Sequence, residues 1–580
     1  MKERRFIEGT LLFLVALAVR LAHGFAIRGE PMFSLPLVDE ALYWQDALRA
    51  ASGAAWEPVL YRPPLLPALL GALVRLFGES PAAARFVLLV LSALAAPLTA
   101  ILAMPIIGRP GALLAGALAA LYAPAVFYGA ELLPASTVHL LNLLALLALL
   151  AAEEKRRLPL FALAGLLVGL SALAWPASLV LLPALLFRYR RDLRAFALVA
   201  AGTALAISPA FLHNLRGGDP VLVTSNGGIN CYRGTHAGAD GWSARAPDLP
   251  NEPGEAKRAA RWIAERAEGR SLRPSEVSAF WSRRALGWIA SSPGAAARLF
   301  ARKVYALIND RDISDNIDFA ATEETSLPLR LAPIRFGLLL ALVLPGIAVL
   351  RRTRGGRLLL LYALSLSLVI LAFFVVGRFR LPLLPFLAVG GAAGLLSIAD
   401  AFRRGPARAA SWLLIVVAAL LVSRTGFLGI DEDRTWHYHY LRGDAFYREG
   451  NLDEATRAFE ESIRRNGRVP LTKNALGFLY AEKGIELERA ERLVREAIAL
   501  EPERRRFYLD SLGLVLLRQG RLAEAAAALE EAIPLFAPEE APSMAEALLH
   551  LAEAREAGGR PALADSLRSE AERLTGGLFR

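Results

Sequence analysis

The chain has 580 residues, of which 55% are hydrophobic and 21% are charged. This mixture is too apolar for an ordinary soluble protein and excludes a disordered chain. The formal charge of +11 is divided unevenly: residues 1–430 hold 44 basic and 27 acidic side chains (net +17), whereas residues 431–580 hold 22 and 28 (net −6). The basic balance therefore belongs to the apolar part and does not indicate nucleic-acid binding. A single cysteine, Cys231, excludes an intrachain disulfide and a cysteine-based zinc cluster.

Apolar runs recur along the first three quarters of the chain. A helix needs about 20 mostly apolar residues to cross a bilayer. On this basis we predict eleven membrane spans, at residues 6–26, 84–104, 111–129, 132–152, 158–175, 177–187, 194–212, 333–350, 357–376, 381–399 and 410–428. The sixth run is short, so Leu158–Phe187, broken at Trp175-Pro176, forms either two short helices or one kinked helix.

The charges of the connecting segments predict the orientation. With a cytoplasmic N-terminus and eleven spans, every basic cluster between spans lies on the cytoplasmic side, as the positive-inside rule requires. A ten-span count would place several of these clusters outside. The eleven-span topology puts residues 27–83, residues 213–332 and the C-terminal tail on the outer, periplasmic side of an inner membrane. A cleaved signal peptide is the alternative for the first span, but no small-x-small cleavage site follows it.

The first outer segment begins with two adjacent carboxylates, Asp39 and Glu40, ahead of an amphipathic stretch with Tyr43 and Trp44. A carboxylate at this position can act as a general base on an acceptor hydroxyl. The structural alternative is a helix N-terminus with acidic residues in its first turn.

Two further polar residues flank the next spans on the outer side. Arg62 stands in the proline-rich run Tyr61–Pro67, where it could contact an anionic headgroup. Glu131 lies at an outer span end, where a second acid or a metal ligand could meet Asp39.

The large outer segment opens with a polar, glycine-rich stretch around Asn226. This stretch is either a binding loop or a turn. Later, Asp310-Arg311-Asp312 fits the Asp-x-Asp pattern that holds a metal in nucleotide-sugar enzymes. We disfavour that interpretation, because no nucleotide sugar is expected on the outer side.

Arg378 and Arg380 are the basic residues of a short outer hairpin, against the positive-inside trend. Guanidinium groups suit phosphate oxygens, and the outer interface suits a lipid-linked phosphate. The pair is therefore the best candidate for phosphate binding.

From about residue 434 the composition changes to Ala, Glu, Leu and Arg with helical spacing. Small and large residues repeat at intervals near 34, in sets that begin with Gly443, Gly477 and Gly513. This is the tetratricopeptide pattern, and it predicts an α-solenoid over residues 434–580 that binds a protein partner. A generic helical bundle is the alternative.

Taken together, the outer motifs resemble the bacterial relatives of the protein O-mannosyltransferases and lipid A aminoarabinose transferases. These are glycosyltransferase family 39-like enzymes of the GT-C fold. The resemblance covers roughly residues 5–400 and rests on motifs in the same order between matching spans: Asp39-Glu40, Arg62–Pro67, Glu131, the Asn226 loop and Arg378-Phe-Arg380-Leu-Pro. The predicted fold is all-α, with a GT-C-like membrane domain at 1–430 and a repeat domain at 434–580.

The resemblance implies a glycosyltransferase whose donor is a polyprenyl-phosphate sugar. It implies that Asp39 is the base, with Glu40 as its neighbour, and that Arg378 and Arg380 lie near the donor phosphate. Arg62, Glu131 and Asn226 are the further expected substrate-binding residues. A divalent metal is possible, no other cofactor is implied, and the acceptor is a lipid, a glycan or a protein.

Two other functions remain open at this stage. An O-antigen ligase or polymerase also combines many spans with a large outer loop, but would be expected to centre on Arg and His of that loop. The second alternative is a non-enzymatic membrane anchor that presents the solenoid to envelope-assembly partners.

Overall fold

The computed structural model describes residues 2–250, 253–426, 429–430, 434–537 and 540–575. The chain forms two compact units, Met1–Glu432 and Asp433–Arg580. The predicted all-α class is confirmed: the described residues contain no strand, and only two isolated β-bridges occur among them.

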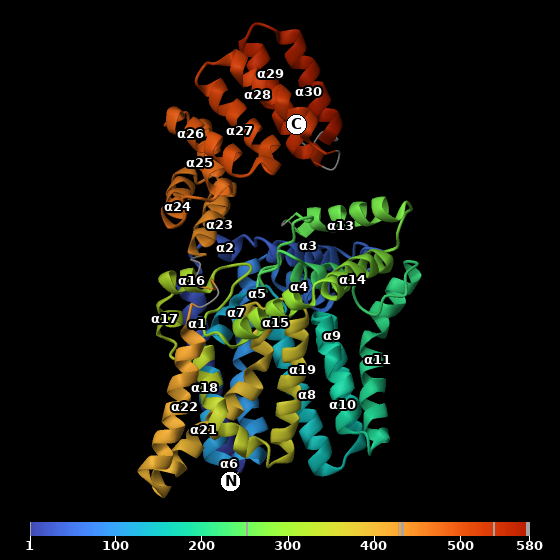
Figure 1. Cartoon of the computed structure of the whole chain (residues 1–580), viewed down its shortest axis with the longest axis vertical. Coiled ribbons are helices and arrows are strands. Elements are labelled where there is room, and N and C mark those ends of the chain that lie inside the picture. The colour runs from blue at the N-terminus through green and yellow to red at the C-terminus, as the bar shows by residue number, and fades with distance from the viewer. Residues whose placement is uncertain (1, 251–252, 427–428, 431–433, 538–539, 576–580) are drawn as a thin grey trace. The chain divides into compact units, whose positions relative to one another are not determined.

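The first unit is a bundle of apolar helices with shorter helices at one end (Figure 1). Its helices before the large outer segment are α1 (Lys2–Ile27), α2 (Pro31–Ser34), α3 (Asp39–Ser52), α4 (Leu65–Phe77), α5 (Pro81–Ala93), α6 (Ala95–Ala120), α7 (Ala123–Ala130), α8 (Ala135–Lys155), α9 (Leu158–Ala174), η1 (Pro176–Val180), α10 (Leu181–Arg188) and α11 (Leu193–Arg216). The later ones are α12 (Gly227–Gly234), α13 (Pro253–Glu268), α14 (Pro274–Ser291), α15 (Pro293–Ile308), α16 (Phe319–Thr325), α17 (Leu327–Leu331), α18 (Phe336–Leu350), α19 (Arg354–Ala372), α20 (Gly377–Arg380), η2 (Leu381–Leu383), α21 (Leu384–Arg404) and α22 (Pro406–Arg424).

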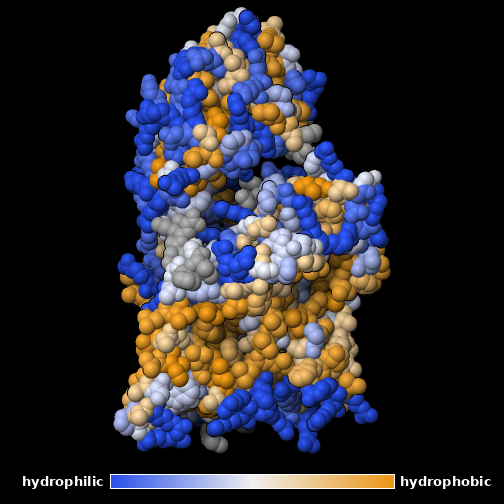
Figure 2. All heavy atoms as spheres, in the orientation of Figure 1, coloured by the Kyte–Doolittle hydropathy of each residue, from blue (hydrophilic) through white to orange (hydrophobic). Residues whose placement is uncertain are grey.

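Apolar side chains cover the bundle as a continuous belt with hydrophilic residues at both borders (Figure 2). Among the described residues, seven helices are long and apolar enough to cross a membrane: Glu3–Ile27, Pro81–Ala120, Ala135–Lys155, Leu193–Arg216, Arg354–Ala372, Gly377–Arg404 and Pro406–Arg424. Shorter apolar helices cover the remaining predicted spans. The chain is thus a multi-pass membrane protein, and the count of eleven spans stays a prediction.

Two breaks in the helices explain why predicted spans and helix boundaries differ. Gly108, at φ +70° and followed by Pro110, interrupts the apolar stretch Pro81–Ala120 between the second and third predicted spans. Trp175 adopts an extended conformation (φ −152°, ψ 100°), so that Leu158–Phe187 forms two separate helical segments. The residue before a proline avoids the helical conformation for steric reasons, which accounts for the second break.

Glycines allow the bundle helices to approach closely. A Cβ atom on Gly165 of α9 would lie 2.0 Å from the carbonyl oxygen of Val199 on α11, and one on Gly202 would lie 2.2 Å from that of Ala162. The same relation joins α18 to α21 at Gly346 and Gly390. Small residues of this kind are typical of helix contacts in membranes, where packing rather than the hydrophobic effect drives association.

The basic connecting segments gather at one end of the bundle. Arg109 pairs with Glu8 at the start of α1, and Arg188 donates to the carbonyl oxygen of Arg354 at the start of α19. The N-terminus lies at this end, and α3, α13 and α14 lie across the opposite one (Figure 1). The candidate site is built at that opposite end.

The second unit consists of helix pairs. They are α23 (Thr435–Arg448), α24 (Leu452–Arg465), α25 (Pro470–Lys483), α26 (Leu487–Leu500), η3 (Pro502–Arg504), α27 (Arg505–Arg518), α28 (Leu522–Ala532), η4 (Ile533–Leu535), α29 (Ala541–Ala557) and α30 (Pro561–Thr575).

The glycines that define the predicted repeat lie at the contacts within each pair. A Cβ atom on Gly443 would lie 2.6 Å from the Phe459 ring, and one on Gly513 would lie 2.4 Å from Leu529 Cγ. The side chain of the second helix thus occupies the space that a larger residue of the first would need, which is why the pattern is detectable in the sequence.

Candidate active site

Asp39 opens helix α3, directly after a strained residue. Val38 has φ +53° and ψ −127°, which is unfavourable for a β-branched side chain and costs on the order of 1–3 kcal/mol. The backbone N–H of Asp39 donates to Asn316 Oδ1 at 3.0 Å. This bond fixes the start of α3 against a segment that lies far away in the sequence.

The carboxylate of Asp39 faces the guanidinium of Arg378. Arg378 Nη2 donates to Asp39 Oδ2 at 2.9 Å and to Asp315 Oδ2 at 2.6 Å, so that one nitrogen bridges two acids. Asn316 Nδ2 also donates to Asp39 Oδ2, at 3.3 Å. The Asp39 side chain remains 28% exposed, against 13% for Arg378. Burial and the neighbouring Asp39 charge raise the pKa of Asp315, and the Arg378 cation opposes this rise.

Arg62 lies in the same region but pairs with a different acid. Its Nε and Nη2 atoms donate to Asp46 Oδ2, at 2.8 and 2.7 Å. Burial and the Asp39 carboxylate raise the pKa of Tyr43, while the cations of Arg378 and Arg62 act in the opposite direction. The hydroxyl of Tyr43 is therefore within electrostatic range of all three predicted site residues.

Glu40 turns away from Asp39 into the interior. It is fully buried and accepts two bonds from Arg85 of α5, at 2.8 and 2.5 Å, and one from the Leu132 N–H at 2.6 Å. Burial and the nearby Glu40 raise the pKa of Glu131 well above its usual value. Glu40 and Glu131 thus form a buried layer with Arg85 rather than a solvent-facing acid pair with Asp39.

The side chain of Arg380 binds backbone carbonyl oxygens of the protein. The sequence predicts it as a phosphate ligand beside Arg378, but its side chain is 2% exposed and donates to the carbonyl oxygens of Asn309 (2.5 Å) and Arg311 (2.6 Å). Successive residues of a helical turn point about 100° apart, so the arginines at 378 and 380 face different neighbours. Its geometry suits a residue that holds the preceding loop in place.

Asn226 stands at the N-cap position of α12, but its side chain makes no capping hydrogen bond. Its Oδ1 accepts from Thr224 Oγ1 at 3.0 Å, and its carbonyl oxygen accepts from the Asn230 N–H. No hydrogen bond among the described residues joins its side chain to Asp39. The predicted turn is therefore present, and the amide itself lies apart from the Asp39–Arg378 pair.

Sequence reasoning missed Asp315 and Asn316, which complete the surroundings of Asp39. They belong to the acidic segment Asp310–Asp318, whose Asp-x-Asp pattern suggests only a metal site when the sequence is read alone. Asp310 instead accepts from the Gly337 N–H at 2.6 Å, and Asp312 accepts from the Tyr128 hydroxyl at 2.6 Å. The signal that could have identified Asp315 and Asn316 is the high density of carboxylates shortly before the predicted span at 333–350.

No set of three His, Cys, Asp or Glu side chains within the described ranges could hold a metal ion. Asp39 and Asp315 are bridged by Arg378, which supplies a positive charge between the two carboxylates. The residues present thus do not fit a metal centre built on Asp39.

The membrane topology and this outer charge cluster can be compared with known families. Residues 61–211 match the family model of dolichyl-phosphate-mannose-protein mannosyltransferases. The match covers 151 of 580 residues and includes Arg62 and Glu131. Residues 478–540 and 511–573 match the tetratricopeptide repeat. Both parts of the predicted resemblance are thereby confirmed over these residues.

Solved structures give weaker similarities. The chain resembles the archaeal oligosaccharyltransferase AglB from Archaeoglobus fulgidus, in complex with an inhibitory peptide and a dolichol-phosphate, with 17% identity, TM-score 0.40, and coverage of 79% of this chain and 59% of that one. The apo form of the A. fulgidus enzyme gives 18% identity and TM-score 0.38, with the same coverage. Yeast Tom70 gives 12% identity and TM-score 0.21, covering 85% and 88%. The chain spans about three fifths of the length of the archaeal enzyme, and no curated protein sequence matches it.

Proposed function

We propose that this protein transfers a sugar from a polyprenyl-phosphate donor to an acceptor hydroxyl on the outer side of an inner membrane. The observation that carries the proposal is the partly exposed Asp39 carboxylate in contact with the Arg378 guanidinium. A base and a phosphate-binding cation side by side are what a single displacement at an anomeric carbon requires. The glycosyltransferase family match over residues 61–211 supports the same reaction class.

The reaction balances without a redox partner. The acceptor oxygen forms a bond to the anomeric carbon while the bond from that carbon to the phosphate oxygen breaks. The polyprenyl phosphate leaves with the bonding electron pair, and Asp39 takes the proton of the acceptor hydroxyl. Arg378 then stabilises the charge that develops on the leaving phosphate.

The contacts of Asp39 support its proposed role as the base and that of Arg378 as the phosphate-binding cation. In the absence of donor, Arg378 is shared between Asp39 and Asp315. A donor phosphate competes for the same guanidinium and weakens its hold on Asp39. The Asp39 carboxylate then has an oxygen free to accept the proton of the acceptor hydroxyl.

The ligase or polymerase alternative has less support. It requires catalytic histidines in the large outer segment, but the two histidines there bind backbone carbonyls. His213 Nε2 lies 2.7 Å from the Glu57 oxygen, and His236 Nε2 lies 2.9 Å from that of Arg245. Neither histidine faces Asp39 or Arg378 through a hydrogen bond in the described part of the chain.

The remaining partners follow from the two-unit architecture. The tetratricopeptide unit supports interaction with a protein, which we propose brings an acceptor or an envelope-assembly partner to the membrane enzyme. The acceptor itself is a lipid, a glycan or a protein.

The test is transfer from a radiolabelled polyprenyl-phosphate sugar by the purified full chain in lipid nanodiscs. Asp39→Asn keeps the size of the side chain and removes the base, so we expect transfer to fall by about 10²–10⁴-fold. Asp400→Asn, on an exposed residue of α21, is the matched control and is expected to retain full transfer. Full transfer by Asp39→Asn would overturn the catalytic assignment. A defect that follows only deletion of residues 434–580 would support the scaffold function instead.

A further inference from the structure

Helix α12 connects two parts of the candidate site. Just before it, the Ser225 N–H donates to the carbonyl oxygen of Leu60 at 3.0 Å, next to Tyr61 and Arg62. At its other end, Gly234 packs so closely on Phe373 that a Cβ atom would lie 2.1 Å from the Phe373 carbonyl oxygen. The helix therefore runs from the Tyr61 segment to the loop that leads into Arg378.

Arg233 lies near the second of these ends and is an incompletely satisfied cation. Its Nη2 donates to the carbonyl oxygen of Pro250 at 3.0 Å, whereas its Nε is buried without a hydrogen-bond partner. Burial lowers the pKa of Arg233, while Tyr61 and Asp39 act in the opposite direction. A buried N–H that lacks an acceptor is costly, so such groups are usually satisfied by a ligand, water or protein atom.

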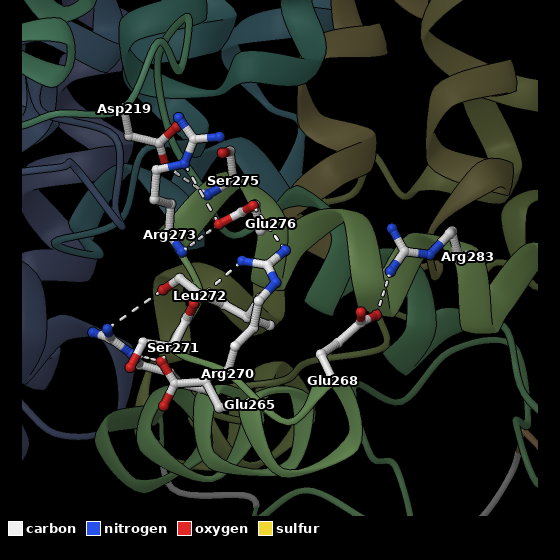
Figure 3. Close-up of polar contacts among 11 residues, drawn as sticks. Asp219, Glu265, Glu268, Arg270, Ser271, Leu272, Arg273, Ser275, Glu276 and Arg283 are labelled. Atoms are coloured by element: carbon white, nitrogen blue, oxygen red, sulfur yellow. Dashed lines mark hydrogen bonds and ion pairs between the residues drawn. The ribbon is translucent and has the colours of Figure 1, made fainter.

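Three arginines of the outer segment contrast with it. At the corner between α13 and α14, Arg270 and Arg273 both donate to Glu276, and Arg283 donates to Glu268 (Figure 3). Within the described part of the chain, Arg233 has no carboxylate at ion-pair distance. Among the described residues its Nε–H thus has no acceptor.

Arg378 is a second arginine whose Nε is buried and has no hydrogen-bond partner. Its Nη2 bridges Asp39 and Asp315. Arg233 and Arg378 thus each have an unsatisfied Nε–H, and Gly234, next to Arg233, packs on Phe373 in the loop that leads into Arg378.

We propose that Arg233 is a second phosphate-binding residue, which together with Arg378 holds the phosphate of the donor lipid. The inference rests on the proposed function and deepens it. A polyprenyl-phosphate sugar is a diester with one negative charge, and the departing polyprenyl phosphate is a monoester that gains a second one. A second cation therefore stabilises the leaving group more than the bound donor, and it contributes to kcat as well as to binding.

The test compares variants of the full chain in nanodiscs by thermal unfolding, with polyprenyl phosphate, the matched neutral polyprenol or inorganic phosphate added. We expect polyprenyl phosphate to raise the Tm of the wild type, and polyprenol and inorganic phosphate to have much smaller effects. Arg233→Ala and Arg233→Gln should lose most of that rise, whereas Arg233→Lys should keep part of it. Arg283→Ala, whose side chain is 63% exposed on α14, is the control and should respond as the wild type does.

Transfer kinetics supply the second measurement. Removing one donor to a developing oxyanion typically costs about 10²-fold in kcat, and we expect a loss of this order for Arg233→Gln. A loss in Arg233→Gln with an unchanged ligand-free Tm is not a folding defect. An equal response to inorganic phosphate would identify a free-phosphate site and overturn the assignment to the lipid.

The outcomes separate the inference from the function on which it rests. If Arg378→Ala abolishes the response to polyprenyl phosphate and the Arg233 variants keep it, the inference fails and the proposed function stands. If the wild type neither responds to polyprenyl phosphate nor transfers a sugar from it, both fail together.

Discussion

The guanidinium of Arg378 lies 2.9 Å from the carboxylate of Asp39, measured from Nη2 to Oδ2, although 339 residues separate them in the chain. The contact joins the first outer segment to the last outer hairpin. Because Asp315 binds the same nitrogen, the cation stands between two acids that would otherwise repel each other. The strength of this arrangement can be measured.

Arg378→Ala is expected to lower stability because it leaves Asp39 and Asp315 close together without a counter-charge. Adding Asp315→Asn to this variant removes one of the repelling charges and should restore part of the Tm. A double-mutant cycle should give a coupling of about 0.5–3 kcal/mol between Arg378 and Asp315. Additive effects on the Tm would contradict the bridging role.

Glu40 and Arg85 are expected to be essential for folding. Both side chains are at most 3% exposed, and removing one partner of a buried pair typically costs about 3–5 kcal/mol. Glu40→Gln and Arg85→Met should therefore reduce the yield and Tm of folded protein. The exposed pair Arg404–Asp400 is the comparison, and Asp400→Ala there should cost less than about 1 kcal/mol. An active, fully stable Glu40→Gln protein would show that the buried pair is dispensable.

Glu131 gives a prediction about pH. Its pKa is raised in the folded protein from a usual value near 4.5, so between the unfolded and the folded pKa unfolding releases a proton from this carboxyl. Ionisation of the unfolded state therefore lowers stability as the pH rises above about 4.5, until the folded pKa is reached. Glu131→Gln removes this loss. We expect its Tm, relative to the wild type, to increase as the pH rises from 5, and a constant difference would argue against a raised pKa of Glu131.

Replacing Arg380 should lower the stability of the protein, whereas replacing Arg378 should weaken its binding of the donor lipid. Arg380 holds the carbonyl oxygens of Asn309 and Arg311, so Arg380→Lys should lower the Tm because one ammonium cannot reproduce both bonds. The folded fraction should keep the KM of the wild type for the donor lipid. Arg378→Lys, in contrast, should raise that KM. A raised KM in the Arg380 variant would return this residue to the phosphate site.

The repeat unit offers a packing test. A Cβ atom on Gly513 would lie 2.4 Å from Leu529, so Gly513→Val should destabilise the second unit by about 1–3 kcal/mol. Limited proteolysis of the full chain should then cleave residues 434–580 faster than in the wild type. Gly467→Ala is the control, since its nearest neighbouring atom lies at 3.6 Å. Equal cleavage of both variants would contradict the packing role.

Much of the fold could be predicted because its signals are local. Apolar runs identify the bundle helices, and Gly443, Gly477 and Gly513 mark the repeat because each lies opposite a large side chain at a fixed spacing. The predicted charge distribution also agrees with the gathering of Arg109 and Arg188 at one end of the bundle.

The arrangement of the candidate site was harder to predict from local sequence signals. Asp39 and Arg378 were predicted as separate motifs, and they are in contact. Glu40 was expected beside Asp39 as a second active acid, but the first turn of α3 directs it into the interior toward Arg85. Arg233 was not singled out, because nothing in its local sequence shows that the neighbouring segments leave its Nε without an acceptor.

By itself, the sequence determined that this is an all-helical membrane protein with a tetratricopeptide tail, since hydrophobicity and repeat spacing depend only on residues near each other in the chain. The tertiary structure alone decided which charges meet. Asp39, Asp315 and Arg378 come from three outer segments, and only the packing of those segments brings their side chains into contact. Long-range contacts also decide whether an arginine is held by backbone carbonyl oxygens, as Arg380 is, or keeps an N–H without an acceptor, as Arg233 does.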